Sequence, residues 1–108
     1  MKRGELYVAA PLGEYGKPRP VVVVQSDLFI AQRDSITVCL LTSDLIDAPL
    51  FRVRVNPGPS NQLKNPSDVM ADELMTLTKG RFGARLGALN IDELAALDQS
   101  LRRWLALP

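Results

Sequence analysis

The segment Pro18-Arg19-Pro20 runs directly into four consecutive valines, Val21–Val24. An unbroken run of β-branched residues favours extended backbone and is typical of a strand that is buried on both faces. Pro20 disfavours the helical region for Arg19, and Pro18 fixes the turn before it. We therefore expect a buried strand whose entrance holds a guanidinium group on rigid, extended backbone.

Further short apolar runs alternate with segments rich in glycine, proline and asparagine, and they indicate more strands. In Leu50–Val55 the apolar residues recur at alternate positions, which is typical of a strand with two different faces. The segment Asn56-Pro57-Gly58-Pro59-Ser60-Asn61 then interrupts regular structure. The remaining strands are expected at Glu5–Ala10, at Ile36–Leu41, around Val69–Leu77 and around Arg85–Leu89.

The C-terminal segment is the clearest helix. Asn90 is a suitable N-cap, and Glu93 stands where its carboxylate can reach back to the cap amide. Apolar residues then recur at three- and four-residue spacing, and basic residues occupy the last turns, as the helix dipole favours. The apolar stripe is Leu94, Leu97, Leu101 and Trp104, and the basic residues are Arg102 and Arg103. We predict a mainly β fold with a C-terminal helix, a small, partly closed antiparallel barrel in one domain spanning residues 1–108.

The composition excludes several classes of enzyme. The chain has no histidine and one cysteine, Cys39, so a Ser-His-Asp or Cys-His device cannot form and a zinc site is nearly excluded. No Gly-rich phosphate loop is present, and we expect no cofactor. A net charge of +1 means that an anionic partner must be bound by a local patch. A lone thiol in an apolar run and the lack of a long apolar segment predict a cytoplasmic protein.

Arginine, carboxylate and hydroxyl groups remain as carriers of chemistry. Arg19 could bind phosphate oxygens as a preorganised fork, and the alternative is a solvated arginine at a strand entrance. Thr42 and Ser43 follow an expected strand, and their hydroxyls could donate hydrogen bonds to the same phosphate. The alternative for them is an ordinary strand-ending turn. From these residues alone, both interpretations stay open.

Two other groups of charged residues are candidates. Asp72 and Glu73 interrupt an apolar segment, where one of them could act as a general base or both could form the wet face of an edge strand. Lys79, Arg81 and Arg85 cluster around two glycines. They could bind a phosphate backbone, or they could belong to a solvated turn.

Several segments, taken in order, carry a resemblance that covers nearly the whole chain. They are Lys2-Arg3-Gly4-Glu5-Leu6-Tyr7, Arg19-Pro20-Val21-Val22-Val23-Val24, Leu41-Thr42-Ser43, Val69-Met70-Ala71-Asp72-Glu73-Leu74, Gly87-Ala88-Leu89-Asn90 and Asp92-Glu93-Leu94-Ala95-Ala96-Leu97-Asp98. In this order and spacing they resemble the MazF/PemK/Kid family of bacterial toxin endoribonucleases. The specificity lies in the ordered set and not in any one motif.

The resemblance implies an SH3-like, CcdB-type barrel that forms a homodimer. It also implies a toxin of a toxin-antitoxin system, an mRNA interferase that cleaves single-stranded RNA at short sequences without a metal and is inhibited by a cognate antitoxin. By position, Arg19 and Thr42 match the catalytic arginine and threonine of the family. Glu14 matches an acidic loop residue implicated in some members, and Asp72 matches an aspartate that some members use as a base. We expect the RNA to be bound by Lys17, Ser43, Lys79, Arg81 and Arg85.

The implied reaction needs no histidine, because RNA supplies its own nucleophile, the 2′-hydroxyl. Arg19 would stabilise the charge that builds on the attacked phosphate, and Thr42 would orient that phosphate. Glu14 or Asp72 would accept the 2′-proton. Two positions depart from some relatives, which carry an arginine where Met70 or Met75 stands.

Three alternatives remain beside the endoribonuclease. The first is a CcdB-like inhibitor of DNA gyrase, which the Arg19-Pro20 and Leu41-Thr42-Ser43 segments disfavour. The second is a degenerate toxin that binds its antitoxin but has lost catalysis. The third is a small barrel that acts only as an interaction module.

Overall fold

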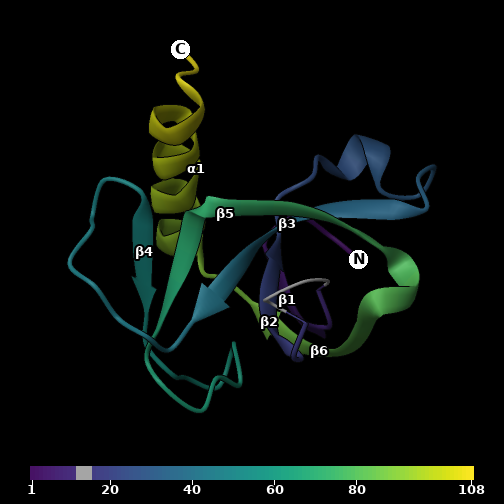
Figure 1. Ribbon diagram of the computed structural model, residues 1–108, viewed down its shortest axis with the longest axis horizontal. Helices are drawn as coiled ribbons and strands as arrows, with labels where there is room; N and C mark the ends of the chain where they lie inside the picture. The colour runs from purple at the N-terminus through teal and green to yellow at the C-terminus, as the bar shows by residue number, and fades with distance from the viewer. Residues whose placement is uncertain (12–15) are drawn as a thin grey trace.

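The computed structural model describes residues 1–11 and 16–108, which form six strands and one α-helix. These elements are β1 (Glu5–Ala9), β2 (Arg19–Val23), β3 (Ser35–Thr42), β4 (Arg52–Val55), β5 (Ser67–Thr78), β6 (Phe82–Ala88) and α1 (Ile91–Leu105). The strands form one antiparallel sheet in the order β4-β5-β3-β2-β1-β6, and α1 lies against β4 and β5 (Figure 1). The predicted antiparallel, mainly β fold with a C-terminal helix is confirmed.

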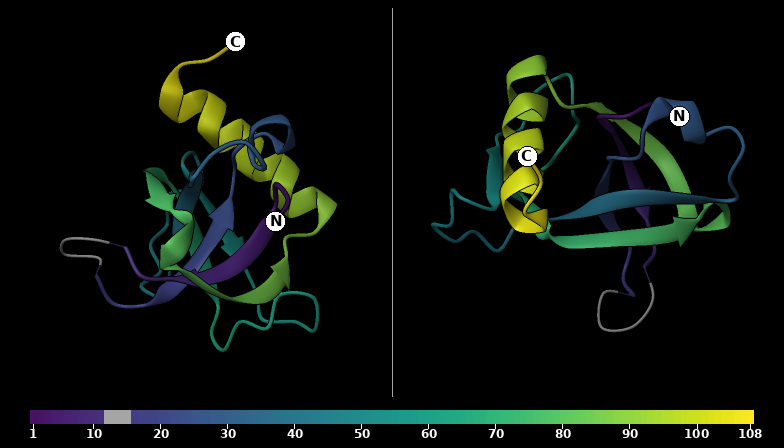
Figure 2. Two further views of the ribbon diagram at one scale, coloured as in Figure 1. Left: turned by 90° about the vertical axis from the view of Figure 1, so that its right-hand side faces the viewer. Right: turned by 90° about the horizontal axis from the view of Figure 1, so that it is seen from above.

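The longest strand is β5, whereas the sequence predicts only short strands around Val69–Leu77. Strand β5 pairs with β3 along most of its length and with β4 at its start. A register shift between Cys39 and Leu40, whose partners are Leu74 and Met70, places a bulge at residues 71–73. A bulge bends a strand, and Figure 2 shows β3 and β5 extending beyond the helix before the chain turns back into β6. Asp72 and Glu73, which break the apolar pattern in the sequence, therefore mark a bend within one strand.

Val21, Val22 and Val23 are buried on the two faces of the sheet, as predicted, while Val24 lies beyond the end of β2 and is partly buried. Val22 belongs to a cluster that includes Leu97 and Leu101 of α1. Val21 and Val23 belong to a second cluster, which contains residues of β1, β3 and β5. All three side chains are fully buried. The strand that carries Arg19 is therefore fixed by packing from both sides.

Helix α1 begins as the sequence predicts. The Asn90 side chain accepts a hydrogen bond from the Glu93 amide, and the Glu93 carboxylate accepts one from the Asn90 amide. The predicted stripe is buried at Leu97 and Leu101, while Trp104 is half exposed and rests against Phe51 with ring centroids 5.5 Å apart. In the described residues, no helix combines the length and the apolar character that crossing a membrane requires.

The loop between β4 and β5, residues 56–66, links the two edges of the sheet. The backbone carbonyl of Ser60 accepts a hydrogen bond from the Ala88 amide of β6 at 2.9 Å. Gly87 has φ +149°, and a Cβ atom there would lie 1.9 Å from the Ser60 carbonyl oxygen. Only glycine allows this close backbone contact, which brings the β4–β5 loop next to the strands that carry Arg19 and Thr42.

Candidate active site

A groove of about 450 Å³ lies where the ends of β2 and β3 meet the β4–β5 loop. Arg19 and Pro20 contribute from β2, and Thr42 and Ser43 contribute from the end of β3. The complete lining is Val8, Pro18, Arg19, Pro20, Leu41, Thr42, Ser43, Gln62, Leu63, Lys64, Asn65, Ser67 and Leu86. Arg19 is far from Thr42 and Ser43 in the sequence, yet all three residues line one concave site.

Sheet pairing explains why Arg19 and Thr42 meet. β2 and β3 are antiparallel, with Val21 opposite Leu40. If this register continues by two residues, Arg19 falls opposite Thr42, and residues opposite each other on adjacent strands have neighbouring side chains. Arg19 is itself a strand residue, opposite Ala9 of β1, so its backbone is extended as the flanking prolines predict.

Thr42 ends β3 with its hydroxyl oriented by the backbone. Its Oγ1 accepts a hydrogen bond from the Asp44 amide at 3.1 Å. A hydroxyl that accepts one hydrogen bond still has its own proton to donate. The turn interpretation and the functional one are therefore compatible, because the turn uses the Thr42 oxygen as an acceptor and leaves the hydroxyl proton available to donate.

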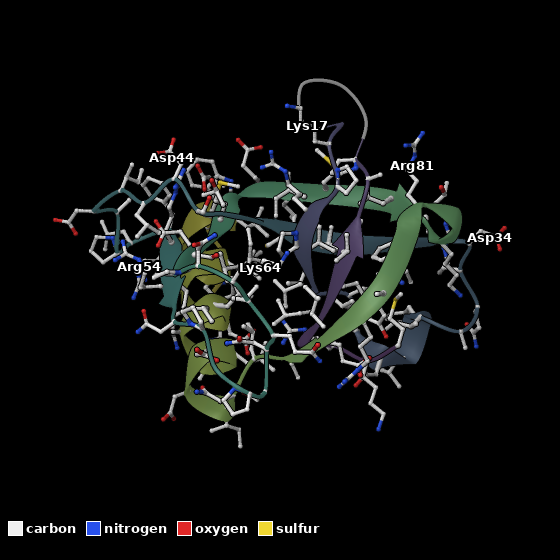
Figure 3. All side chains as sticks on the ribbon, turned by 90° about the horizontal axis from the view of Figure 1, so that it is seen from below. Lys17, Asp34, Asp44, Arg54, Lys64 and Arg81 are labelled. Atoms are coloured by element: carbon white, nitrogen blue, oxygen red, sulfur yellow. The ribbon has the colours of Figure 1, made fainter. Side chains whose placement is uncertain are left out.

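The opposite wall of the groove was not predicted from the sequence. Gln62, Lys64 and Asn65 of the β4–β5 loop line it, and all three residues are exposed. In Figure 3, Lys64 lies between Arg54 and the strands β2 and β1. The described lining thus contains two cations, Arg19 and Lys64, and no carboxylate. Such a lining attracts anions.

A second arginine-rich site, the Asp68 cluster, consists of Asp68, Arg52 and Arg54. The Asp68 carboxylate is 2.6 Å from Arg54 Nε and 3.7 Å from Arg52 Nη1, and it accepts a hydrogen bond from the Ile46 amide at 3.2 Å. Burial opposes its ionisation, but these hydrogen bonds and the two positive charges outweigh burial and lower the pKa of Asp68. The positive charges of Arg52 and Arg54 are therefore compensated by the Asp68 carboxylate.

Of the two candidate general bases, only Asp72 belongs to the described residues. Asp72 does not line the groove, and its carboxylate Oδ1 lies 3.9 Å from Arg52 Nε beside β4. The role of Asp72 as a general base, which the family resemblance implies, stays a prediction, and the bulge in β5 lies beside this position near Arg52. Glu14 lies outside the described residues.

The predicted basic cluster also lies elsewhere. Lys79 Nζ donates to the Ile30 carbonyl and Arg81 to the Ala10 carbonyl. Arg85 Nε lies 2.7 Å from the Glu5 carboxylate. None of the three lines the groove, and Figure 3 shows Arg81 on the opposite side of the molecule from Arg54. Lys17 is exposed and precedes Pro18, which does line the groove.

Met70, Met75 and Cys39 pack within the apolar core. Met70 belongs to the buried cluster that contains Val21 and Val23, and Met75 packs against this cluster. Burial raises the pKa of the Cys39 thiol to about 12, so this cysteine is not a nucleophile at neutral pH. Among residues 1–11 and 16–108, no group of three or more histidine, cysteine, aspartate or glutamate side chains could hold a metal ion.

The fold and the groove together define a small curled β protein with a cationic site at its strand ends. A family model described as PemK-like, MazF-like toxin of type II toxin-antitoxin system matches residues 2–105. The chain is 38% identical over 108 residues to the probable endoribonuclease MazF of Mycolicibacterium smegmatis. The aligned region covers 99% of this chain and 98% of that protein. It is 30% identical over 112 residues to endoribonuclease MazF6 of Mycobacterium tuberculosis, and this alignment covers 99% of this chain and 98% of that protein.

Solved structures give the same result for the fold. The Mycobacterium tuberculosis toxin MazF-mt6 has a TM-score of 0.83 at 22% identity, over 96% of this chain and 98% of that chain. An endoribonuclease in complex with its cognate antitoxin, from a mycobacterial species, has a TM-score of 0.82 at 26% identity, over 100% and 97%. The chain belongs to the PemK-like, MazF-like toxin family of type II toxin-antitoxin systems. The expected CcdB/PemK-type fold is confirmed.

Proposed function

We propose that this protein is a toxin endoribonuclease that cleaves single-stranded RNA in the groove between β2, β3 and the β4–β5 loop. The observation that carries the proposal is the presence of Arg19 and Thr42 in one groove whose described lining has two cations and no carboxylate. The relatives named endoribonuclease MazF, 30% to 38% identical over nearly the whole chain, support the same activity.

The chemistry follows from what these side chains can do. The 2′-hydroxyl of the RNA attacks the adjacent phosphorus, the bond to the 5′-oxygen breaks, and a 2′,3′-cyclic phosphate remains. Negative charge builds on the nonbridging oxygens, where the Arg19 guanidinium and the Thr42 hydroxyl donate hydrogen bonds. Fixed donors of this kind contribute about 2.7–4 kcal/mol each to transition-state stabilisation.

The attacking hydroxyl must lose a proton, and Glu14 is our candidate for accepting it. Glu14 matches an acidic loop residue of the family, and it precedes Lys17 and Arg19 in the chain. Asp72 is less suited to this role, because it lies near Arg52 and outside the groove lining.

The proposal includes partners of the protein. We propose a cytoplasmic homodimer that is inhibited by a cognate antitoxin, and the solved relative in complex with its antitoxin supports the second partner. Leu74 of β5 and Leu105 and Leu107 at the C-terminal end line a shallow pocket and are exposed. Exposed apolar side chains that lie together favour association, which supports the homodimer.

The test is cleavage of a long single-stranded RNA in the presence of EDTA. We expect defined fragments that end in a 2′,3′-cyclic phosphate. We expect Arg19→Ala to abolish these fragments. Arg33→Ala is the matched control, because Arg33 is exposed, does not line the groove and should leave cleavage unchanged.

The same assay separates the alternatives. Intact RNA from a folded protein that still binds its antitoxin would instead indicate a degenerate toxin. Intact RNA together with inhibition of DNA gyrase would indicate a CcdB-like protein. Equal cleavage by the wild-type protein and the Arg19→Ala variant would show that another site is responsible.

A further inference from the structure

The β4–β5 loop is fixed from within by a buried side chain. Asn61 is only 4% exposed. Its Oδ1 accepts hydrogen bonds from the amides of Gly58 at 3.1 Å and Leu63 at 3.0 Å, and its Nδ2 donates to the carbonyl of Asn56 at 2.9 Å. Despite its glycine, prolines and asparagines, the loop therefore has a defined backbone.

The loop is also fixed from outside. The hydrogen bond between Ala88 and the Ser60 carbonyl and the close approach of Gly87 to Ser60 dock it against β6. At its other end, the Ser67 hydroxyl donates to the Asn65 carbonyl at 3.0 Å. The position of this wall relative to Arg19 and Thr42 is thus set by contacts that involve no substrate.

Three polar side chains on this rigid wall leave their hydrogen-bonding groups unused within the fold. Gln62, Lys64 and Asn65 line the groove, and their side chains make no hydrogen bond to any other described residue. Gln62 has φ +52°, a left-handed conformation that residues other than glycine rarely adopt. A rigid backbone that presents two free carboxamides and one ammonium group to a groove is suited to binding a polar ligand.

The chemistry of these groups indicates what they bind. A carboxamide has a donor and an acceptor side by side and can pair with the edge of an unpaired base, which single-stranded RNA exposes. A lysine ammonium is a point charge that suits a backbone phosphate and carries no sequence information.

We propose that the β4–β5 loop reads the bases beside the cleaved phosphate, Gln62 and Asn65 through their carboxamides, while Lys64 binds the RNA backbone. The inference rests on the proposed endoribonuclease function. It makes this loop a determinant of where the RNA is cut.

The test is cleavage of a random-sequence single-stranded RNA pool, followed by sequencing of the fragment ends. In the double variant Gln62→Ala/Asn65→Ala we expect cleavage at the preferred sequences to slow by about tenfold and cleavage at other sequences to change little. The base preference at one or two positions beside the cut should weaken by about tenfold, as expected for lost carboxamide–base contacts.

Gln62→Asn tolerates the left-handed backbone and withdraws the amide by one methylene, so it should shift the same preference. Gln99→Ala, an exposed amide on α1, is the matched control and should leave the profile unchanged.

Lys64→Ala should slow cleavage at all sequences alike and reduce its salt dependence.

An unchanged base preference in the double variant, with cleavage still present, would overturn the inference and leave the proposed function intact. A loss of cleavage that is uniform across all sequences would overturn it as well, because the contacts would then be non-specific. No cleavage by the wild-type protein would refute the proposed function, and this inference with it. Circular dichroism confirms that each variant is folded.

Discussion

The groove and the Asp68 cluster meet in the row of the sheet that pairs Arg54, Asp68 and Thr42, but different groups surround their basic side chains. Arg54 pairs with Asp68, and Asp68 pairs with Thr42. If the register of β2 and β3 continues by two residues beyond Val21 and Leu40, Arg19 lies on the other side of Thr42. On one side of the row, a buried carboxylate contacts two arginines. On the other side, the described lining has cations and hydroxyls but no carboxylate.

The comparison shows why counting charges does not locate a site. The chain has 13 basic and 12 acidic residues, and each of the two pockets contains two cations. The pocket beside the Asp68 cluster also contains Asp47 and Asp68, so its charges cancel. A site for an anionic substrate is therefore sought where basic side chains line a concave surface, which a count of charges over the whole chain does not show.

After the loss of cleavage expected for Arg19→Ala, the largest effect is expected from the Thr42 hydroxyl in the groove. Thr42→Val keeps the shape of the side chain and removes its hydrogen-bond donor. We expect cleavage to slow by about 100- to 1,000-fold, because a donor to the developing charge is lost. Single-turnover cleavage of RNA measures the rate. Thr78→Val, an exposed threonine at the end of β5, is the control. A slowing of less than about tenfold in Thr42→Val would remove Thr42 from the reaction.

Gly87→Ala tests whether the loop wall depends on its docking against β6. The new Cβ atom would lie 1.9 Å from the Ser60 carbonyl oxygen, so backbone must move. We expect a loss of about 3 kcal/mol in the free energy of unfolding, measured with urea. Gly80→Ala is the control, since no atom lies within 4 Å of its Cβ position. Equal stability of the two variants would contradict the rigid docking of the loop.

Arg54→Ala is the counterpart of Arg19→Ala on the other side of the row. It leaves the buried Asp68 carboxylate without its 2.6 Å partner, while Arg52 and the Ile46 amide remain. We expect the free energy of unfolding to fall, because an ionised group loses part of its compensation. Cleavage per folded molecule should be unchanged. A large loss of activity in a stable Arg54→Ala protein would show that the two sites are one.

The smallest effect concerns pH. The pKa of Asp68 and the pKa of Glu5 are both lowered in the folded protein from ordinary values of 3.8 and 4.5. For Glu5, burial opposes the shift, and hydrogen bonds from Arg85, Lys2 and Tyr7 outweigh it. A lowered pKa stabilises the fold above the ordinary value, and this contribution is lost as the pH falls through the folded-state pKa. Unfolding free energies should thus decline below about pH 4, and less steeply in Asp68→Asn.

Local patterns predict the fold well where packing and capping agree with the sequence. The valine run and the capping box of Asn90 and Glu93 identify β2 and α1 directly. The length of β5 could not be predicted, because Asp72 and Glu73 end the apolar pattern in the middle of a strand that continues through a bulge.

The site is predictable only in part, for a related reason. Arg19 and Thr42 have distinctive local sequences, and antiparallel pairing of consecutive strands brings them together. No distinctive local sequence marks Gln62, Lys64 and Asn65. Their position in the groove depends on the buried Asn61 and on Gly87, a residue of another strand. The role of Asp72 was inferred from its position in the sequence, but the path of β5 places it beside Arg52.

The most direct measurement uses an RNA with a single 2′-deoxy nucleotide on the 5′ side of the preferred cleavage position. If Arg19 and Thr42 act on a phosphate that the RNA's own 2′-hydroxyl attacks, this one substitution should abolish cleavage at that linkage while binding stays within a few-fold. Continued cleavage of the 2′-deoxy linkage would contradict the proposed chemistry of the groove.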